Sequence, residues 1–438
     1  MITIEERAGR RRRLIEALRR EDAPTDGVAL VQGAPKPSIH GRFRQFNDFG
    51  YLCGVDTPHA YLALDVHDGS SHLFLPYQAP DLREREGPLA SAADPEGARR
   101  STGVDEVHGI ERLASFLERR RVVWTPMRAG EGAMQSWDTL QRAAQERVSD
   151  PWDGRPDRHR WFVRQLRERL PQTCLRDLAP FVDELRLIKS EGEIALLRRA
   201  GRLAADGLVA AMRRTRPGVA EYQLEAELRY VYLDGGARDV AYRAIVAGGD
   251  NAWYGHYDRN DAVLADGDLV LVDCGPDYQD YASDITRIWP VNGRYSDLQR
   301  ELYGFIVAYH EAFLRLLRPG VTRERVQEEA AAEMVHVVER TRFSHPIYEQ
   351  AARRALVFPH HLSHPVGMAV HDVGHYRGRR MEPGLVITVD PQLIIPEERR
   401  YLRVEDTVVI TEDGIENLTA AAPLDLDATE AVIAQGRG

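Results

Sequence analysis

The segment GDLVLVDCGPDYQDYASDITRIWPV (267–291) decides the fold of the C-terminal part of the chain. Two apolar runs flank a stretch rich in Gly, Pro, Asp and Gln, which is the pattern of two strands joined by a turn. Asp273 ends the first run, and Asp284 lies within the second. These two positions are symmetric about 278–279, so a hairpin bent there would bring the two carboxylates close together.

The same construction recurs towards the C-terminus. Asp390 ends the run GLVITVDP (384–391), and Glu405 lies within YLRVEDTVVIT (401–411). The polar segment PEERR (396–400) is near their midpoint and predicts a turn. Two hairpins would therefore each supply a pair of carboxylates from rigid strands.

Histidines are concentrated between these two hairpins. Five of the 15 histidines lie within 16 residues, where even scattering would place about half a histidine. They are His360, His361, His364, His371 and His375. Both His364 and Asp390 precede a proline, which favours extended backbone and suits side chains that project from strands.

Four carboxylates brought together would repel one another and need a cation. A pair of divalent metal ions held by carboxylates and one imidazole meets that need. The alternative is that each carboxylate pairs with a neighbouring arginine, such as Arg287 or Arg403, or faces solvent. The coincidence of both pairs with the histidine cluster favours the metal site.

Composition limits the class of protein. The chain has 438 residues, more than a single hydrophobic core normally serves, so we expect two domains. With 58 basic and 68 acidic residues the formal net charge is −10, which argues against nucleic acid as a partner. No stretch approaches the about 18–20 apolar residues that a membrane span needs.

The cysteines and the N-terminus bear on location. Three cysteines without a CxxC pair, Cys53, Cys174 and Cys274, predict no disulfide framework and favour a reducing cytoplasm. The first residues contain arginines but no apolar core or cleavage site, so they do not resemble a secretory signal.

Hydrophobic periodicity predicts an α+β protein, with an α/β N-terminal domain followed by long helices and an antiparallel sheet. The expected domains are 1–172, a linker at 173–182, and a C-terminal domain at 183–438. Helices are expected over 5–21, 108–119, 136–147, 158–169, 183–214 with a break, 220–235, 297–317 and 322–341. Strands are expected at 27–33, 50–55, 60–66, 72–77, 121–126, 267–275, 281–291, 384–391 and 401–411, and a long loop at 79–104.

At the two carboxylate hairpins and the histidine cluster, the sequence resembles the pita-bread metallopeptidases, specifically the Xaa-Pro aminopeptidase (aminopeptidase P) and prolidase group. The matching C-terminal blocks are DELRLIKSEGEIALLRRA (183–200), AIVAGGDNAWYGHY (244–257), LVDCGPDYQDYASDITRIWPV (271–291), HHLSHPVGMAVHDVG (360–374), GLVITVDP (384–391) and LRVEDTVVIT (402–411). GRFRQFNDFGYLCGVDTPHAYLALD (41–65) is similar to the N-terminal domain of the aminopeptidase P type. The resemblance implies a creatinase-like α/β domain followed by a pita-bread catalytic domain.

Carried over position by position, the resemblance implies a set of site residues. Asp284 and Glu405 would bridge two metal ions, and Thr286 would orient a ligand. Arg403 would position substrate or the carboxylates. The metal ligands would be Asp273, Asp284, His364, Asp390 and Glu405, and the substrate side would be lined by His256, His360 and His371.

The resemblance also implies a reaction. Two divalent ions, Mn²⁺ first and Co²⁺, Zn²⁺ or Fe²⁺ as alternatives, would share a hydroxide that hydrolyses the Xaa-Pro bond at peptide N-termini. The partner would be a peptide with proline second, and the family implies a homodimer or homotetramer. Three alternatives stay open: a prolidase acting on Xaa-Pro dipeptides, a C–N hydrolase or lyase of the same fold, and a non-enzymatic interaction module.

The sequence departs from the family pattern at four places. Asp390 stands where the family usually has Glu, and Gln392 and Ile394 replace the usual glycine and aromatic residue that follow. His361 replaces a small glycine, and the segment 79–104 lacks a Trp-Gly pattern. These departures predict an altered substrate pocket around an intact metal site.

Overall fold

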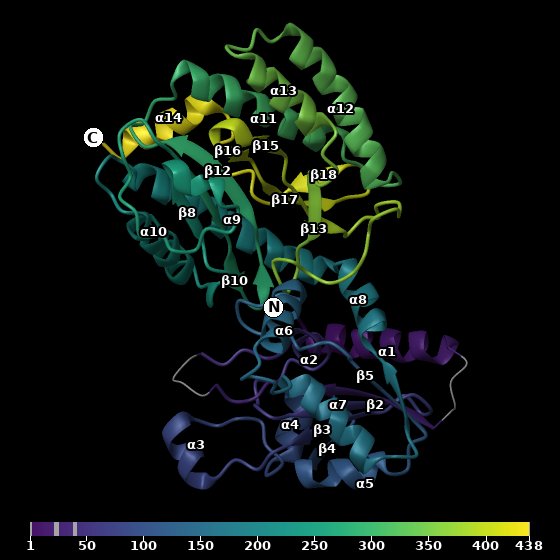
Figure 1. The fold of residues 1–438 in the computed structure, drawn as a ribbon. Coiled ribbons are helices and arrows are strands. Elements are labelled where there is room, and N and C mark those ends of the chain that lie inside the picture. The colour runs from purple at the N-terminus through teal and green to yellow at the C-terminus, as the bar shows by residue number, and fades with distance from the viewer. Residues whose placement is uncertain (1, 22–25, 38–41, 438) are drawn as a thin grey trace. The chain divides into compact units, whose positions relative to one another are not determined.

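The computed structural model describes residues 2–21, 26–37 and 42–437, and the chain divides into two compact units. Unit 1 spans Met1–Arg186 and unit 2 spans Leu187–Gly438, each with helices packed on strands (Figure 1). The predicted three-part division stays a prediction, because compactness alone does not delimit a linker. No helix within the described ranges is long and apolar enough to cross a membrane.

Unit 1 is built on one six-stranded mixed sheet with the order β4-β3-β2-β1-β5-β6. Every residue of the central strand β1 is buried, as expected for a strand covered on both faces. Strands β3 and β4 pair in parallel, as do β1 with β5 and β5 with β6, whereas β1–β2 and β2–β3 are antiparallel. The strands are β1 (Gly27–Gln32), β2 (Tyr61–Asp65), β3 (Ser71–Leu75), β4 (Glu106–Gly109), β5 (Val122–Thr125) and β6 (Cys174–Asp177).

The helices of unit 1 confirm the predictions at 5–21, 136–147 and 158–169 to within two residues. They are α1 (Ile4–Arg20), α2 (Asn47–Leu52), α3 (Pro80–Glu86), α4 (Pro95–Thr102), the 3₁₀ turn η1 (Ile110–Arg112), α5 (Leu113–Leu117), α6 (Trp137–Ser149), α7 (Arg158–Arg169) and α8 (Ala179–Leu187), the last at the boundary between the units.

Three local predictions in unit 1 are wrong. The expected strand at 50–55 overlaps helix α2, where Asp48 is buried and ion-paired to Arg186 at 2.7 Å, so tertiary contacts override strand propensity. The loop at 79–104 contains α3 and α4, each beginning at a proline and ending at a glycine with positive φ. The helix expected from 108 begins only after strand β4, which pairs with β3.

Unit 2 contains two antiparallel sheets whose strands contribute to one hydrophobic core. One has the order β12-β9-β8 and the other β13-β14-β17-β18. They meet at a bridge in which Thr286 and Glu405 exchange backbone hydrogen bonds of 3.2 and 3.1 Å. The strands are β8 (Ile245–Gly248), β9 (Leu269–Cys274), β12 (Ile285–Pro290), β13 (Leu362–Pro365), β14 (Val386–Val389), β17 (Asp406–Ile410) and β18 (Ile415–Asn417), with the hairpin β15 (Gln392–Ile395) and β16 (Arg400–Arg403) beside them, and the shorter β7 (Asp239–Val240), β10 (Pro276–Tyr278) and β11 (Tyr281–Ala282).

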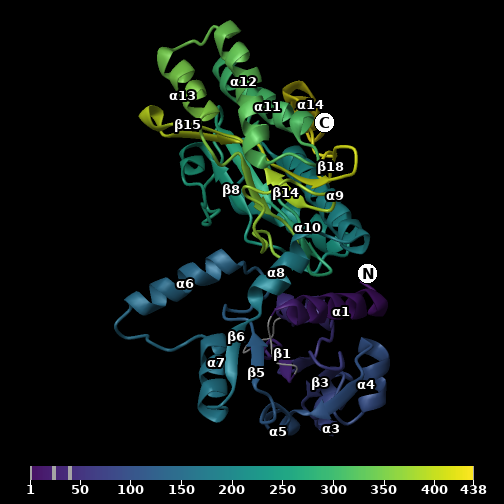
Figure 2. The ribbon, with the colours of Figure 1, turned by 90° about the vertical axis from the view of Figure 1, so that its right-hand side faces the viewer.

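Helices cover these sheets, with α11, α12 and α13 together on one side in both views (Figures 1 and 2). Helix α9 begins at a capping box formed by Ser190 and Glu193, and its apolar face enters the core. The helices are α9 (Glu191–Arg214), α10 (Glu221–Asp234), α11 (Asp297–Leu316), α12 (Arg323–Arg340), α13 (Pro346–Leu356) and α14 (Leu426–Gln435), with 3₁₀ turns η2 (Gly249–Trp253) and η3 (Pro396–Glu398). The break within 183–214 is confirmed, while α13 and α14 are additions to the sequence prediction.

Candidate metal centre

The first predicted carboxylate pair is brought together by the β9–β12 hairpin. Asp273 lies in β9 opposite Thr286, and Asp284 directly precedes β12. The hydroxyl of Tyr242 lies 2.6 Å from Asp273 Oδ1 and 2.5 Å from Asp284 Oδ1. One hydroxyl proton can serve only one of these oxygens at a time. The arrangement therefore favours a proton or a cation shared between the two carboxylates.

The second pair lies next to the first. Glu405 precedes β17, and the Thr286 hydroxyl donates to Glu405 Oε2 at 2.9 Å. Asp390 lies between β14 and β15, where the Gln392 amide donates to its Oδ2 at 3.1 Å. Thr286 thus orients a carboxylate across the bridge between the two sheets.

Arg403 connects the two pairs. Its guanidinium forms an ion pair with Asp273, and its Nε lies 3.7 Å from Asp390 Oδ1 and 3.9 Å from Glu405 Oε2. His364 reaches the same place from β13, with Nε2 3.5 Å from Asp284 Oδ2. We call Asp273, Asp284, His364, Asp390 and Glu405 the carboxylate cluster; the structure brings all five predicted ligands together.

Within the carboxylate cluster, Asp284, His364 and Glu405 each offer a ligand atom, and these atoms lie within 4.8 Å of one another. Asp284, Asp390 and Glu405 are all at least 96% buried. Burial, and then the neighbouring Glu405 carboxylate, raise the pKa of Asp284 and of Asp390 far above the ordinary value. Burial also raises the pKa of Glu405, to about 7.

These observations fit a cation. Asp390 Oδ1 is buried and has no hydrogen-bond partner among the described residues. Arg403 supplies one positive charge to four carboxylates, which leaves the cluster with an excess of negative charge. Oxygen-rich donors with one imidazole suit divalent ions. The donor set therefore fits the two-metal site that the sequence resemblance implies.

The predicted histidines separate into different environments. The His371 ring is half-buried and lies against the His364 ring, with centroids 4.1 Å apart. His256 follows η2 in an exposed position, and His360 is also exposed, with its ring 5.4 Å from that of Phe358. A substrate-binding role for His256 and His360 stays a prediction.

His361 faces the hydrophobic core and not the carboxylate cluster. It is fully buried, its Nε2 lies 2.7 Å from the Ala355 carbonyl, and its ring packs edge-on to Tyr309 at 5.0 Å. Burial lowers the pKa of His361 to about 4, so the ring is neutral near pH 7. The replacement of the family's small residue thus acts on packing behind Asp390.

A buried ion pair that the sequence analysis did not identify supports the segment that carries His371. Lys189 Nζ lies 3.3 Å from Asp372 Oδ2, and both side chains are about 1% exposed. At Gly367 a Cβ would come within 2.0 Å of the same Asp372 oxygen, so this close approach requires glycine. Tyr242 was likewise missed, because no motif marks a tyrosine whose role depends on two distant aspartates.

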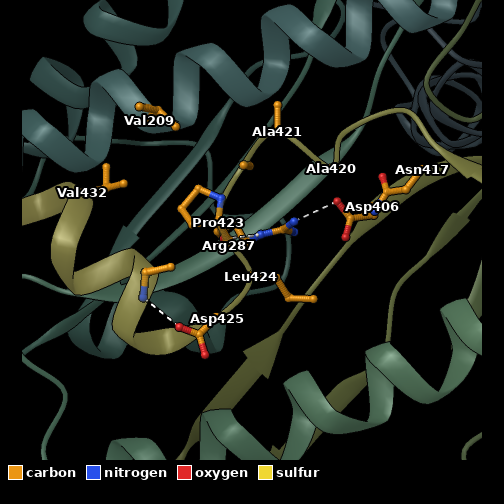
Figure 3. Close-up of a pocket in the computed structure, with 12 residues that line it drawn as sticks. Val209, Arg287, Asp406, Asn417, Ala420, Ala421, Pro423, Leu424, Asp425 and Val432 are labelled. Atoms are coloured by element: carbon orange, nitrogen blue, oxygen red, sulfur yellow. Dashed lines mark hydrogen bonds and ion pairs between the residues drawn. The ribbon is translucent and has the colours of Figure 1, made fainter.

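Behind Glu405, a second buried network fixes the backbone. Arg287 donates to the Glu405 carbonyl at 2.8 Å and to Asp406 Oδ1 at 2.8 Å, and the latter contact is drawn in Figure 3. A pocket of about 390 Å³ opens beside this pair, lined largely by small and apolar residues of 420–432. Arg287 thus holds the backbone at Glu405 and the start of β17, and does not neutralise the carboxylate cluster itself.

Comparisons with known proteins define the class. Residues 195–412 match metallopeptidase family M24, and residues 8–122 match the aminopeptidase P N-terminal domain. The chain belongs to metallopeptidase family M24, and the predicted α/β domain followed by a pita-bread domain is confirmed.

Individual relatives match along nearly the whole chain. The Xaa-Pro aminopeptidase of Escherichia coli K12 is 36% identical and covers 98% of this chain and 97% of its own. Zn-substituted E. coli aminopeptidase P in complex with product gives a TM-score of 0.79 at 34% identity, covering 100% and 99% of the two chains. Proline aminopeptidase P II from Yersinia pestis gives 0.79 at 35% identity, covering 99% and 100%.

Proposed function

We propose that this protein is an Xaa-Pro aminopeptidase, a metal-dependent hydrolase that removes the N-terminal residue from peptides with proline second. The observation that carries the proposal is the convergence of four buried carboxylates and the half-buried His364 around one arginine, in a member of metallopeptidase family M24. The names and whole-chain coverage of the relatives support the Xaa-Pro specificity.

We propose Asp273, Asp284, His364, Asp390 and Glu405 as the residues that hold two divalent ions, with Mn²⁺ as the first choice. Four hard oxygen donors and one imidazole suit Mn²⁺, and also Co²⁺, Zn²⁺ and Fe²⁺. When bound, such a pair of ions polarises the substrate carbonyl and makes water available as a nucleophile near neutral pH.

The residues of the chain have separate tasks in the reaction. The Thr286 hydroxyl donates to Oε2 of Glu405 and so orients that carboxylate at the metal centre. Arg403 holds Asp273, and its positive charge opposes the rise in the pKa of the neighbouring Asp390 and Glu405. The His371 imidazole, beside His364, can stabilise charge on the carbonyl oxygen and deliver a proton to the departing proline nitrogen.

The test uses the full-length protein stripped of metal and reloaded with Mn²⁺, Co²⁺ or Zn²⁺. A tripeptide with proline second is expected to lose its N-terminal residue, while the same peptide with alanine second is not. Faster cleavage of Xaa-Pro dipeptides than of tripeptides would identify a prolidase instead. Stoichiometric metal binding without cleavage of either would favour a C–N hydrolase or lyase of the same fold and overturn the proposal.

We also propose that the protein forms a homodimer or homotetramer in the cytoplasm. The three cysteines are free thiols, and two of them, Cys53 and Cys274, are buried, which suits a reducing compartment. Analytical ultracentrifugation measures the assembly, and a single species at the monomer mass would overturn that part of the proposal.

A further inference from the structure

A second group of metal-ligating side chains lies in unit 1, on strands β3 and β4. His72 is directly opposite Glu106 in the parallel register, and His108 is two residues beyond Glu106. Because side chains alternate along a strand, all three point to the same face of the sheet. We call His72, Glu106 and His108 the imidazole cluster.

The distances in the imidazole cluster match those of a tetrahedral metal site. His72 Nδ1 and His108 Nε2 are 3.2 Å apart, and Glu106 Oε2 lies 3.6 Å from the first and 3.2 Å from the second. With metal–ligand distances near 2.0–2.1 Å, the edge of a tetrahedron around Zn²⁺ is about 3.3 Å. The three ligand atoms therefore already form one face of such a tetrahedron.

The hydrogen bonds around His72 favour the tautomer that binds metal. Ser70 Oγ lies 2.6 Å from Asp68 Oδ1 and 2.8 Å from His72 Nε2. The carboxylate accepts the hydroxyl proton, so the hydroxyl oxygen accepts from His72 Nε2–H. His72 Nδ1 then presents its lone pair to the cluster, in the way that a hydrogen bond from the other ring nitrogen orients a metal-ligating histidine.

Packing holds the two rings in place. The His72 ring lies 4.8 Å from that of Phe116, and the His108 ring lies 5.0 Å from that of Phe74. The Glu106 side chain is 59% exposed, whereas the side chains of His72 and His108 are 11% and 17% exposed. A fourth ligand position would thus face solvent on the Glu106 side.

We propose that the imidazole cluster is a binding site for one transition-metal ion, Zn²⁺ first, held by His72 Nδ1, His108 Nε2, Glu106 and a water. Two imidazoles and one carboxylate suit Zn²⁺ and Co²⁺ far better than Mn²⁺. The ion would connect the edge strand β4 to β3 and stabilise unit 1 through binding to the folded state. The inference is independent of the proposed peptidase activity, because it uses none of the same residues.

The alternative is an ordinary hydrogen bond between the rings, in which His108 Nε2–H donates to His72 Nδ1 and Glu106 takes part only at the surface. To decide, the full-length protein is stripped with a chelator, reloaded with Zn²⁺, freed of excess metal and analysed for Zn²⁺ per chain. His108→Ala is expected to lose one equivalent relative to the unchanged protein. The exposed His67 provides the matched control, because His67→Ala is expected to lose none.

A second variant keeps the proposal testable if His108→Ala fails to fold. Glu106→Gln changes an exposed side chain, and it is expected to weaken Zn²⁺ binding at one site in competition with a chromophoric chelator. In the Co²⁺-loaded protein, the tetrahedral absorption from this site should disappear in His108→Ala and decrease in Glu106→Gln. Equal Zn²⁺ content and affinity in Glu106→Gln, His67→Ala and the unchanged protein would overturn the proposal, whether or not the protein cleaves peptides.

Discussion

The carboxylate cluster of unit 2 and the imidazole cluster of unit 1 show two ways of placing metal-ligating side chains. The first is buried and dominated by acidic groups whose pKa values are raised by burial. The second is partly exposed, and its two imidazoles can satisfy each other by a hydrogen bond of 3.2 Å. Folding of unit 2 therefore buries carboxylates whose repulsion a bound cation would relieve. Folding of unit 1 leaves the imidazoles paired with each other, so a cation can bind there but the fold does not depend on it.

The largest effect is expected from Asp284→Asn in the carboxylate cluster. Asp284 contacts Tyr242 and approaches His364, and it is one of the proposed metal ligands, so its loss is expected to weaken metal binding. We expect turnover of an Xaa-Pro tripeptide to fall by more than about a hundredfold, the loss that removing a hydrogen-bond partner of a metal ligand can cause. Metal analysis should show lower occupancy in unit 2.

His108→Ala is the matched control for that comparison, since it alters a ligand set outside unit 2. Its turnover should equal that of the unchanged protein. Unchanged turnover in Asp284→Asn would exclude Asp284 as a ligand and remove the basis for the proposed chemistry.

Metal removal should destabilise the protein in a pH-dependent way. Between the ordinary carboxyl pKa of 4.5 and the value of about 7 for Glu405, the native metal-free protein holds more protons than the unfolded chain. Its free energy of unfolding should therefore fall as the pH rises through this window, by about 3 kcal/mol from Glu405 alone, and the raised pKa values of Asp284 and Asp390 act in the same direction. Denaturant unfolding at pH 5 and pH 8, with and without chelator, measures the difference.

The metal-loaded protein should show a much smaller slope over the same window, because bound cations keep the carboxylates ionised. With Mn²⁺ as the loaded metal, which the imidazole cluster is expected to bind poorly, His108→Ala should respond to the chelator with the same pH dependence. Parallel curves for the loaded and chelated forms would show that the buried carboxylates do not depend on a cation.

Asp390→Glu tests how closely the site tolerates a change in side-chain length. A ligand position should accept the longer carboxylate, and we expect turnover to stay within about tenfold with an altered preference between Mn²⁺ and Zn²⁺. The Gln392 amide, which donates to Asp390 Oδ2, would have to shift. Steady-state kinetics under each metal measure both effects.

The exposed Asp413 offers a control for that substitution, because Asp413→Glu changes side-chain length without any role in the site. Identical metal preference in Asp390→Glu, Asp413→Glu and the unchanged protein would place residue 390 outside the metal coordination.

Much of unit 2 was predictable because its hairpins are local. Turn residues near 278 and 396–400 set the strand register, and register places Asp273 near Asp284 and Asp390 near Glu405. The direction of each histidine was not predictable. A register shift between Leu362 and Pro365 lies between His361, which enters the core, and His364, which reaches the carboxylates.

The imidazole cluster was not predictable for a different reason. His72 and His108 are 36 residues apart, and they meet only because β3 and β4 pair in parallel across α3 and α4. The segment between them was predicted to be a loop, and a loop fixes no register. Tyr242 presents the same difficulty, since its contacts with Asp273 and Asp284 join positions 31 and 42 residues away.

The smallest effect is expected from Ser70→Ala, which leaves all three residues of the imidazole cluster in place. Without the hydroxyl, His72 loses the partner that holds its proton on Nε2, so both tautomers become accessible. We expect Zn²⁺ affinity at this site to fall by about tenfold. The free energy of unfolding of the metal-free protein should change by less than about 1.5 kcal/mol, the value of one hydrogen bond.

Competition with a chromophoric chelator measures the affinity, and Ser149→Ala, at an exposed position on α6, is the control. Equal affinities in the two serine variants would mean that the tautomer of His72 is fixed by something other than Ser70. A tenfold difference without any change in peptide turnover would show that the two clusters act independently, because the Ser70 hydroxyl bonds to Asp68 and His72, both in unit 1.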